Sequence, residues 1–262
     1  MTAPVRATQQ DGVRTLTLDR PEAMNALDLA TKDALLVAVR EAADDPEARC
    51  VVLTGTGRAF CVGQDLKEHV TLLHEDPAQV WSTVREHYNP VIELLSTMDK
   101  PVLAAVNGVA AGAGAALAFA ADLRYVADTA GFNLAFAGVA LSCDSGSSWT
   151  LPRLVGIAKA KELLLLPRTV QAAEAAELGL VTELVPAAQL AARVHEVAAR
   201  LAAGPTLAYG ALRRAVAFSA GSSLAESLAH EAELMDRTGT SADHQRAVAA
   251  FLAKQTPVFT GE

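Results

Sequence analysis

A strand, a glycine-rich turn and a helix follow one another between residues 101 and 123, and this succession points to an α/β fold. The apolar run "PVLAAV" is typical of a buried strand, and "NGVAAGAGAALAFAADL" turns and then becomes helix-forming. The start of such a helix presents unpaired backbone N–H groups, which favour a phosphate or another negatively charged oxygen. A second interpretation stays open, in which the glycines and alanines only let the helix pack closely on a sheet.

Neither common nucleotide-binding motif fits this turn. A P-loop needs a Lys followed by Ser or Thr, and no such pair follows Gly108 and its neighbours. The dinucleotide fingerprint begins at Gly112 and Gly114 but meets Leu117 at its sixth position, far from the first strand. The motifs therefore argue against a dinucleotide-binding protein.

A second glycine turn, "TGTGRAFCVGQDLKE" at residues 54–68, also leaves a predicted buried strand and also runs toward a helix-forming segment. Two such turns could direct their N–H groups at the same oxygen. That arrangement is an oxyanion hole, in which each donor is worth a factor of about 10²–10³ in rate.

Composition and charge restrict the class of protein. The chain has 262 residues, 51% of them hydrophobic, and a formal net charge of −8, which argues against a nucleic-acid surface. Its polar start and the interrupted apolar stretch at 104–121 predict neither secretion nor a membrane span. The cysteines Cys50, Cys61 and Cys143 lack the spacing of a metal site, and an odd, small number fits a reducing cytoplasm.

Predicted strands and helices alternate up to about residue 185, after which helices take over. We expect an α/β core at 1–200 and a helical C-terminal part at 201–262. The segment from 67 to 95 is charged and is expected to be a loop followed by an amphipathic helix. The stretch at 130–139, "AGFNLAFAGV", is expected to be extended.

Four stretches in order carry a family resemblance that covers nearly the whole chain. "RPEAMNALD", "GRAFCVGQDLKE", "KPVLAAVNGVAAGAGAALAFAADLRY" and "DSGSSWTLPRLVG" resemble the successive signatures of the enoyl-CoA hydratase/isomerase (crotonase) superfamily. The resemblance implies a crotonase-type core of repeated ββα units, a helical C-terminal oligomerisation part, and homotrimers or hexamers. It also implies an acyl-CoA thioester substrate and no separate cofactor. Within the family, "FCVGQDL", "GAGA" and "CDSG" are most similar to the ring-epoxide isomerases of phenylacetate degradation.

The resemblance gives the two turns a task. In the family, the thioester carbonyl accepts hydrogen bonds from two backbone N–H groups, which here belong to Gln64 and Ala113. Family members usually have glycine at the second place, and an alanine keeps its N–H. Family hydratases use two glutamates to activate water, and the matching positions here are Ala116 and Phe136, neither of which can handle a proton.

Asp144, in "LSCDSGS", is the remaining candidate for acid–base chemistry. The isomerases that the chain resembles have an aspartate at this place that acts as acid and base. The alternative is that Asp144 caps the following helix, because Asp before Ser-Gly-Ser is a common helix start.

The resemblance also implies where CoA binds. The family places CoA-contacting groups after the first turn, here Asp65, Leu66 and Lys67. It uses a C-terminal helix, often of a neighbouring subunit, for the adenine and the 3′-phosphate, and the matching residues are Phe251 and Lys254. Solvent exposure of Lys67 and ordinary helix packing of Phe251 stay open as alternatives.

These features together predict an acyl-CoA isomerase that stabilises a thioester enolate and moves a proton with Asp144. The alternatives are an enoyl-CoA hydratase and a non-catalytic acyl-CoA-binding subunit. The segment at 68–88 is expected to line the acyl pocket, but it contains no specificity code from which the acyl group could be named.

Overall fold

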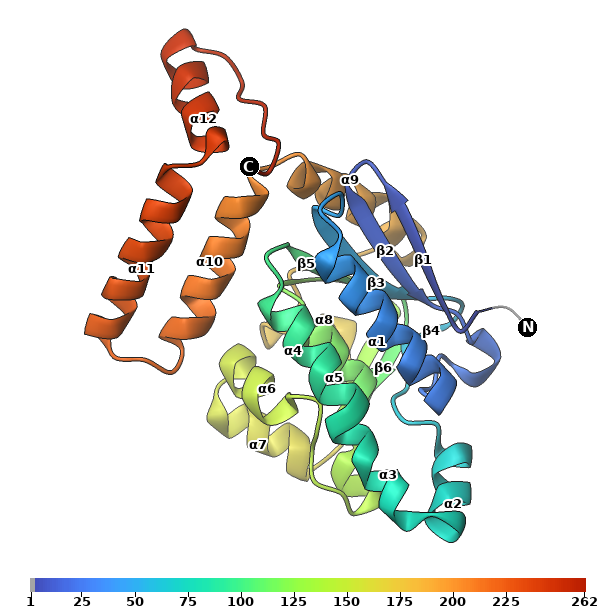
Figure 1. The fold of residues 1–262 in the computed structure, drawn as a ribbon. Coiled ribbons are helices and arrows are strands. Elements are labelled where there is room, and N and C mark those ends of the chain that lie inside the picture. Colours follow the sequence, from blue (N-terminus) through green and yellow to red (C-terminus); the bar gives the residue numbers. More distant parts are fainter. Residues whose placement is uncertain (1–2) are drawn as a thin grey trace.

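Two β-sheets form the centre of the computed structural model, which describes residues 3–262 apart from the side chains of residues 77–79 (Figure 1). The strand order is β1-β2-β3-β5-β7-β10 in the larger sheet and β4-β6-β8-β9 in the smaller one. The larger sheet comprises β1 Val5–Gln10, β2 Val13–Leu18, β3 Cys50–Gly55, β5 Val102–Val106, β7 Leu123–Ala127 and β10 Glu183–Val185. The smaller sheet comprises β4 Ala59–Cys61, β6 Val109–Ala111, β8 Gly131–Asn133 and β9 Thr169–Gln171.

The strands alternate between the sheets along the chain. β3, β5 and β7 pair in parallel in the larger sheet, and each is followed by one strand of the smaller sheet, β4, β6 or β8, which also pair in parallel with one another. Only β1 with β2 and β8 with β9 pair antiparallel among the described strands. This pattern confirms the expected α/β core of repeated ββα units.

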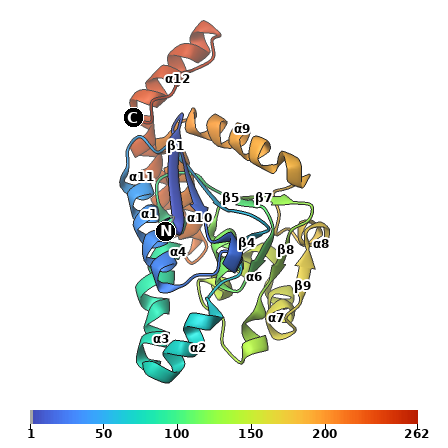
Figure 2. The same cartoon turned by 90° about the vertical axis from the view of Figure 1, so that its right-hand side faces the viewer.

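Helices cover the larger sheet on both sides. The helix α9 packs on β2, β3, β5 and β7, whereas α1 packs on β1, β2 and α4. Figure 2 shows α1 and α9 on opposite sides of β1 and β2. The helices of this part are α1 Leu29–Asp44, α2 Leu66–Glu75, α3 Pro77–Thr83, α4 Asn89–Thr97, α5 Ala113–Ala120, α6 Ser147–Val155, α7 Ile157–Leu165, α8 Ala172–Glu177 and α9 Leu190–Ala202, with short 3-10 turns at Pro21–Ala23, Ala135–Val139 and Ala187–Gln189.

The sequence explains the best-predicted elements directly. Every residue of β5 is buried, as its apolar run indicates, and Leu16, Leu53 and Leu103 are fully buried at the centre of the sheet. The helix α1 begins where expected, because the Asp28 carboxylate accepts a hydrogen bond of 2.9 Å from the backbone N–H of Thr31.

Two sequence-based expectations were wrong. The segment at 67–95 does not begin as a loop, because Asp65 caps α2; after a break at Asp76 the chain is helical again through α3, a π-helical turn at Val84–Tyr88 and α4, so the expected helix is present. The stretch at 130–139 is extended only through Asn133 and then forms the 3-10 turn Ala135–Val139. In both places, charged or small residues gave no clear periodicity.

Three further helices follow the core, namely α10 Thr206–Ser219, α11 Leu224–Gly239 and α12 Ala242–Ala253. Figure 1 shows α10 and α11 side by side next to the core, with α12 extending beyond them. Arg213 of α10 fixes this group of helices, since it donates to the backbone oxygens of Leu95 and Met98 and pairs with Asp122. The division of the chain at residue 200 stays a prediction, and that residue lies in α9.

Within residues 3–262, every helix is too short or too polar to serve as a membrane span.

Candidate active site

The first glycine turn leaves the N–H of Gln64 without a partner. Leu27 forms hydrogen bonds with the residues on either side of Gln64. The N–H of Leu27 donates to the oxygen of Gly63 at 2.8 Å, and the oxygen of Leu27 accepts from the N–H of Asp65 at 3.1 Å. The peptide between Gly63 and Gln64 is planar and trans, so the Gln64 N–H points away from Leu27. Among the described residues, no acceptor bonds to that N–H.

The second turn leaves the N–H of Ala113 free in the same way. Gly112 adopts a φ of +52° and directs the chain into α5, whose first residue is Ala113. The Gly112 N–H donates to the oxygen of Asn133 at 2.9 Å, but that of Ala113 has no acceptor among the described residues. Unpaired donors are expected in the first turn of a helix.

Glycines bring the two turns into contact. A Cβ atom on Gly63 would lie 2.9 Å from the oxygen of Ala111 and 3.2 Å from the nitrogen of Ala113. A Cβ atom on Gly114 would lie 2.0 Å from the oxygen of Cys61, which no side chain could tolerate. The structure therefore places the N–H groups of Gln64 and Ala113 on neighbouring turns, where one oxygen could accept from both.

Asp144 lies in the loop before α6 and does not cap that helix. The N-cap is Gly146, without a side-chain capping bond, and the Asp144 carboxylate instead accepts a hydrogen bond of 2.8 Å from the hydroxyl of Ser145. Burial raises the pKa of Asp144 above its ordinary value, and the bond from Ser145 opposes this rise only in part. A half-buried carboxylate with a raised pKa is suited to proton transfer.

Tyr88 contacts the first turn through its hydroxyl. Its hydroxyl donates a hydrogen bond of 2.5 Å to the side-chain oxygen of Gln64. Burial raises the pKa of Tyr88, and the nearby charge of Asp144 is the next largest cause. The loop of Asp144 also packs on α4, where a Cβ on Gly146 would lie 3.2 Å from Ile92. Sequence reasoning missed Tyr88, because a single tyrosine in a charged segment carries no signal.

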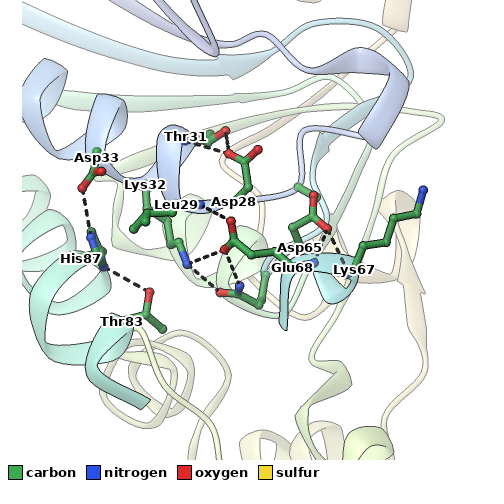
Figure 3. Close-up of polar contacts among 12 residues, drawn as sticks. Asp28, Leu29, Thr31, Lys32, Asp33, Asp65, Lys67, Glu68, Thr83 and His87 are labelled. Atoms are coloured by element: carbon green, nitrogen blue, oxygen red, sulfur yellow. Dashed lines mark hydrogen bonds and ion pairs between the residues drawn. The ribbon is translucent and has the colours of Figure 1, made fainter. Parts of the chain in front are cut away.

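The two positions that the resemblance matches to the hydratase glutamates carry apolar side chains. Ala116 is buried within α5, and Phe136 is buried in the 3-10 turn after β8. Glu68 lies near the first turn, but its carboxylate accepts from the N–H of Leu29 at 2.8 Å and pairs with Lys32 at 3.3 Å. Glu68 is therefore engaged in holding α1 and α2 together (Figure 3).

The candidate CoA contacts after the first turn differ in their availability. The Asp65 carboxylate caps α2 and pairs with Arg20 at 3.2 Å; burial would raise its pKa, but these hydrogen bonds outweigh burial and lower it. Leu66 and Lys67 are exposed, and Figure 3 shows Lys67 extending away from the polar cluster around Glu68. Backbone and aliphatic contacts at Leu66 and the ammonium of Lys67 are accordingly open to a ligand.

A cavity of about 120 Å³ opens beside Gln64, between α1, α2 and α3. Several of its lining residues belong to the segment at 68–88 that was expected to line the acyl pocket. Polar side chains predominate in this lining, which consists of Leu29, Lys32, Gln64, Glu68, His69, Leu72, Val80, Ser82, Thr83, Glu86 and His87.

The candidate CoA residues of the C-terminal helix lie apart from the two turns of the same chain. Phe251 is 80% exposed on α12, and Lys254 ends that helix with a φ of +56°. Figure 1 shows α12 at the opposite end of the molecule from α2. The chain alone therefore does not bring Phe251 and Lys254 to Gln64 and Ala113.

Neither cysteine near the sheets is poised for nucleophilic or metal chemistry. Burial raises the pKa of Cys50 and of Cys61 to about 12, which keeps both thiols protonated. Among the described residues, no three His, Cys, Asp or Glu side chains are grouped so that they could hold a metal ion.

Comparison with known proteins supports the same family as the motifs. The family model described as enoyl-CoA hydratase/isomerase matches residues 8–262. The chain is 42% identical to a probable enoyl-CoA hydratase of Rhodobacter capsulatus, with 98% of each chain covered. It is 38% identical to the 1,2-epoxyphenylacetyl-CoA isomerase of Escherichia coli, with 97% of each chain covered.

Solved structures give the same result for the fold. The chain superposes with a TM-score of 0.92 on the crystal structure of an enoyl-CoA hydratase from Bacillus anthracis. The two sequences are 31% identical, and the match covers 99% of this chain and 100% of the other. The resemblance drawn from the four sequence stretches is thus confirmed, as is the crotonase-type core.

Proposed function

The chain belongs to the enoyl-CoA hydratase/isomerase (crotonase) family, and we propose that within it this protein is an isomerase of acyl-CoA thioesters. One observation carries the choice of isomerase over hydratase. Asp144 is a half-buried carboxylate with a raised pKa, whereas Ala116 and Phe136 occupy the places of the two hydratase glutamates. One acid–base group suffices to move a proton, but the activation of water in the family uses two.

The two turns supply the electrostatic part of the mechanism. The thioester oxygen accepts hydrogen bonds from the N–H groups of Gln64 and Ala113, which have no acceptor among the described residues. Removing a proton from the neighbouring carbon leaves a charge that spreads onto this oxygen. Because the two donors already face it, they stabilise the enolate more than the substrate.

Asp144 supplies the proton transfer. The ionised carboxylate takes a proton from one carbon of the acyl group, and the resulting acid returns a proton to another position. The bond order shifts between these positions and no atom is gained or lost. Burial keeps the pKa of Asp144 raised, so that it is a stronger base than an exposed aspartate.

The substrate class that we propose is an arylacetyl-CoA carrying a ring epoxide. Two observations support it, namely the 38% identity to 1,2-epoxyphenylacetyl-CoA isomerase and the polar lining of the cavity beside Gln64. CoA is part of the substrate, and the proposal includes no separate cofactor.

A homotrimer or a hexamer belongs to the same proposal. Phe251 and Lys254 are exposed on α12 and lie far from the turns of their own chain, so they would bind the CoA of a neighbouring subunit. Apolar side chains exposed on α10 and α11, including Leu212, Val216 and Leu224, would be covered by this assembly. Sedimentation of the purified protein measures the number of subunits.

An enoyl-CoA hydratase is the second candidate, and the 42% identity to a probable enoyl-CoA hydratase favours it. One experiment separates the two. The protein is incubated in deuterated water with phenylacetyl-CoA, its ring 1,2-epoxide and crotonyl-CoA, and the products are followed by NMR. We expect deuterium at the α carbon and isomerisation of the epoxide, with slow water addition to crotonyl-CoA.

Fast water addition would contradict the proposal and identify a hydratase. Binding of all three thioesters without exchange, isomerisation or hydration would identify a non-catalytic acyl-CoA-binding subunit.

A further inference from the structure

The side chain of Gln64 is held by three polar neighbours. Its oxygen accepts the hydrogen bond of 2.5 Å from the Tyr88 hydroxyl and a longer one of 3.4 Å from the ammonium of Lys32. Its amide nitrogen donates to Glu68 at 3.5 Å, the upper limit for such a bond. The hydrogen bond from the Tyr88 hydroxyl is thus the shortest and strongest of the three that fix the Gln64 side chain.

Lys32 and Tyr88 are buried, whereas Gln64 and Glu68 are partly exposed. The Lys32 side chain is only 3% exposed and is paired with Glu68, which also accepts from Leu29 at the start of α1 (Figure 3). A side-chain network is rigid when all its members are satisfied. The network therefore ties α1, α2 and the segment of Tyr88 together at Gln64.

The π-helical turn Val84–Tyr88 places Tyr88 for this contact. His87 and Tyr88, the last two residues of this turn, are both buried. His87 anchors the turn, since one ring nitrogen lies 3.1 Å from Asp33 of α1 and the other 3.2 Å from the hydroxyl of Thr83. Turns of this type occur frequently at functional sites.

We propose that Tyr88 is a positioning residue that acts through the side chain of Gln64 and keeps the Gln64 N–H aimed at the thioester oxygen. The inference rests on the proposed function. Leu27 holds the backbone of the turn through the oxygen of Gly63 and the N–H of Asp65, and Tyr88 holds the same turn through the side chain of Gln64. A preorganised donor stabilises the enolate without reorganisation, so a small displacement reduces the rate.

The Tyr88 hydroxyl is a donor throughout the working pH range. Burial raises its pKa, and the negative charges of Asp144 and Glu68 raise it further. The hydroxyl therefore keeps the proton that it donates to Gln64.

The test uses Tyr88→Phe, which removes the hydroxyl and keeps the ring. The probe is phenylacetyl-CoA labelled with ¹³C at the thioester carbonyl, whose infrared stretching frequency falls when an oxyanion hole polarises it. We expect a smaller fall in frequency than in the wild type, and an exchange kcat lower by about tenfold, with KM changed by less than about twofold. Tyr125→Phe removes a tyrosine hydroxyl from β7 and is expected to behave as the wild type.

A double-mutant cycle with Gln64→Ala tests whether Tyr88 acts through that side chain. Gln64→Ala keeps the backbone N–H, so the two single variants and the double variant should lose the same factor in kcat. If Tyr88→Phe does not fold, Gln64→Ala alone gives the test, because it breaks the same contact and leaves Tyr88 in place. A full frequency shift and a wild-type kcat in the folded variants, or additive losses in the cycle, would overturn the inference.

Failure of the proposed function gives a different result. In that case the wild-type protein itself would show no frequency shift, or Asp144→Asn would exchange protons at the wild-type rate. Asp144→Asn is expected to keep the full frequency shift and lose the exchange.

Discussion

At the scale of single residues, Gly63 and Gly114 decide whether the two turns can meet. A side chain at either place would collide with backbone atoms of the opposite turn, at Ala111 and at Cys61 respectively. The contact is made by backbone rather than by side chains, so no rotamer change can relieve such a collision. The hydrogen-bond donors of the site therefore depend on residues that themselves carry no functional group.

Gly114→Ala is expected to separate the turns. Its Cβ would lie 2.0 Å from the oxygen of Cys61, so the backbone must shift and both activity and stability should fall, the latter by about 1–3 kcal/mol or more. Gly221→Ala is the matched control, because its Cβ meets nothing within 4 Å, and its effect should stay within about 0.5 kcal/mol. Urea unfolding measures both variants, and equal stabilities would contradict the close approach.

Asp144→Asn should stabilise the protein at neutral pH. Burial raises the pKa of Asp144 above 3.8, so the stability that its neutral carboxyl group contributes is fully present below the unfolded pKa and is lost as the pH rises through the folded pKa. The neutral amide avoids that loss, and the advantage should vanish below about pH 3.8, where the wild-type side chain is neutral. Thermal unfolding from pH 3 to 8 tests this, with the exposed Glu93→Gln as control. A variant less stable than the wild type at pH 7 would contradict it.

At the scale of elements, sequence patterns predicted those that bury continuous apolar runs. β3 and β5 consist of such runs, and α1 begins at a capping aspartate. β4 and β6 have three residues each, too few for a periodicity, so the smaller sheet was foreseen only through the family resemblance. The contact of Tyr88 with Gln64 joins residues 24 apart and depends on a π-helical turn that no local pattern indicates.

The last helix is fastened by the C-terminal tail. The buried carboxylate of Asp243 accepts from the N–H groups of Thr260 and Gly261 and pairs with Arg246. Arg49, before β3, donates to the backbone oxygen of Phe259 at 3.0 Å. These contacts fix the orientation of α12, which carries the candidate CoA residues.

Asp243→Asn should loosen the tail. Burial would raise the pKa of Asp243, but its hydrogen bonds outweigh burial and lower the pKa below 3.8, so its contribution to stability is present above that pH and is lost as the pH falls through its folded pKa. Hydrogen exchange of residues 255–262 should become faster at pH 7, with little change for the exposed control Asp236→Asn. Unchanged exchange would mean that other contacts hold α12.

At the scale of the whole molecule, the site combines parts that lie far apart in the sequence. The turns at Gln64 and Ala113 lie against each other and the loop of Asp144 packs on α4, whereas Phe251 lies on α12, which extends away from the core. The family resemblance could name these residues one by one. It could not show which of them a single chain brings together, because this depends on how α12 is oriented.

Binding of CoA should stabilise the folded protein as a whole. A ligand present at 100 times its Kd adds about 2.7 kcal/mol, so free CoA should raise the Tm, whereas NAD should not. Differential scanning fluorimetry with both ligands provides the measurement. A shift with NAD and none with CoA would contradict the assignment of an acyl-CoA site.

The most direct test of the account is the rate of proton exchange by Asp144→Asn. The amide keeps the size of the side chain but cannot take up a proton, so deuterium exchange of phenylacetyl-CoA and isomerisation of its ring epoxide should fall by about 10²–10⁴. Affinity for CoA should be unchanged, because the backbone donors and the exposed residues after the first turn remain. Exchange and isomerisation at near wild-type rates in the folded variant would contradict the role of Asp144 as the acid and base.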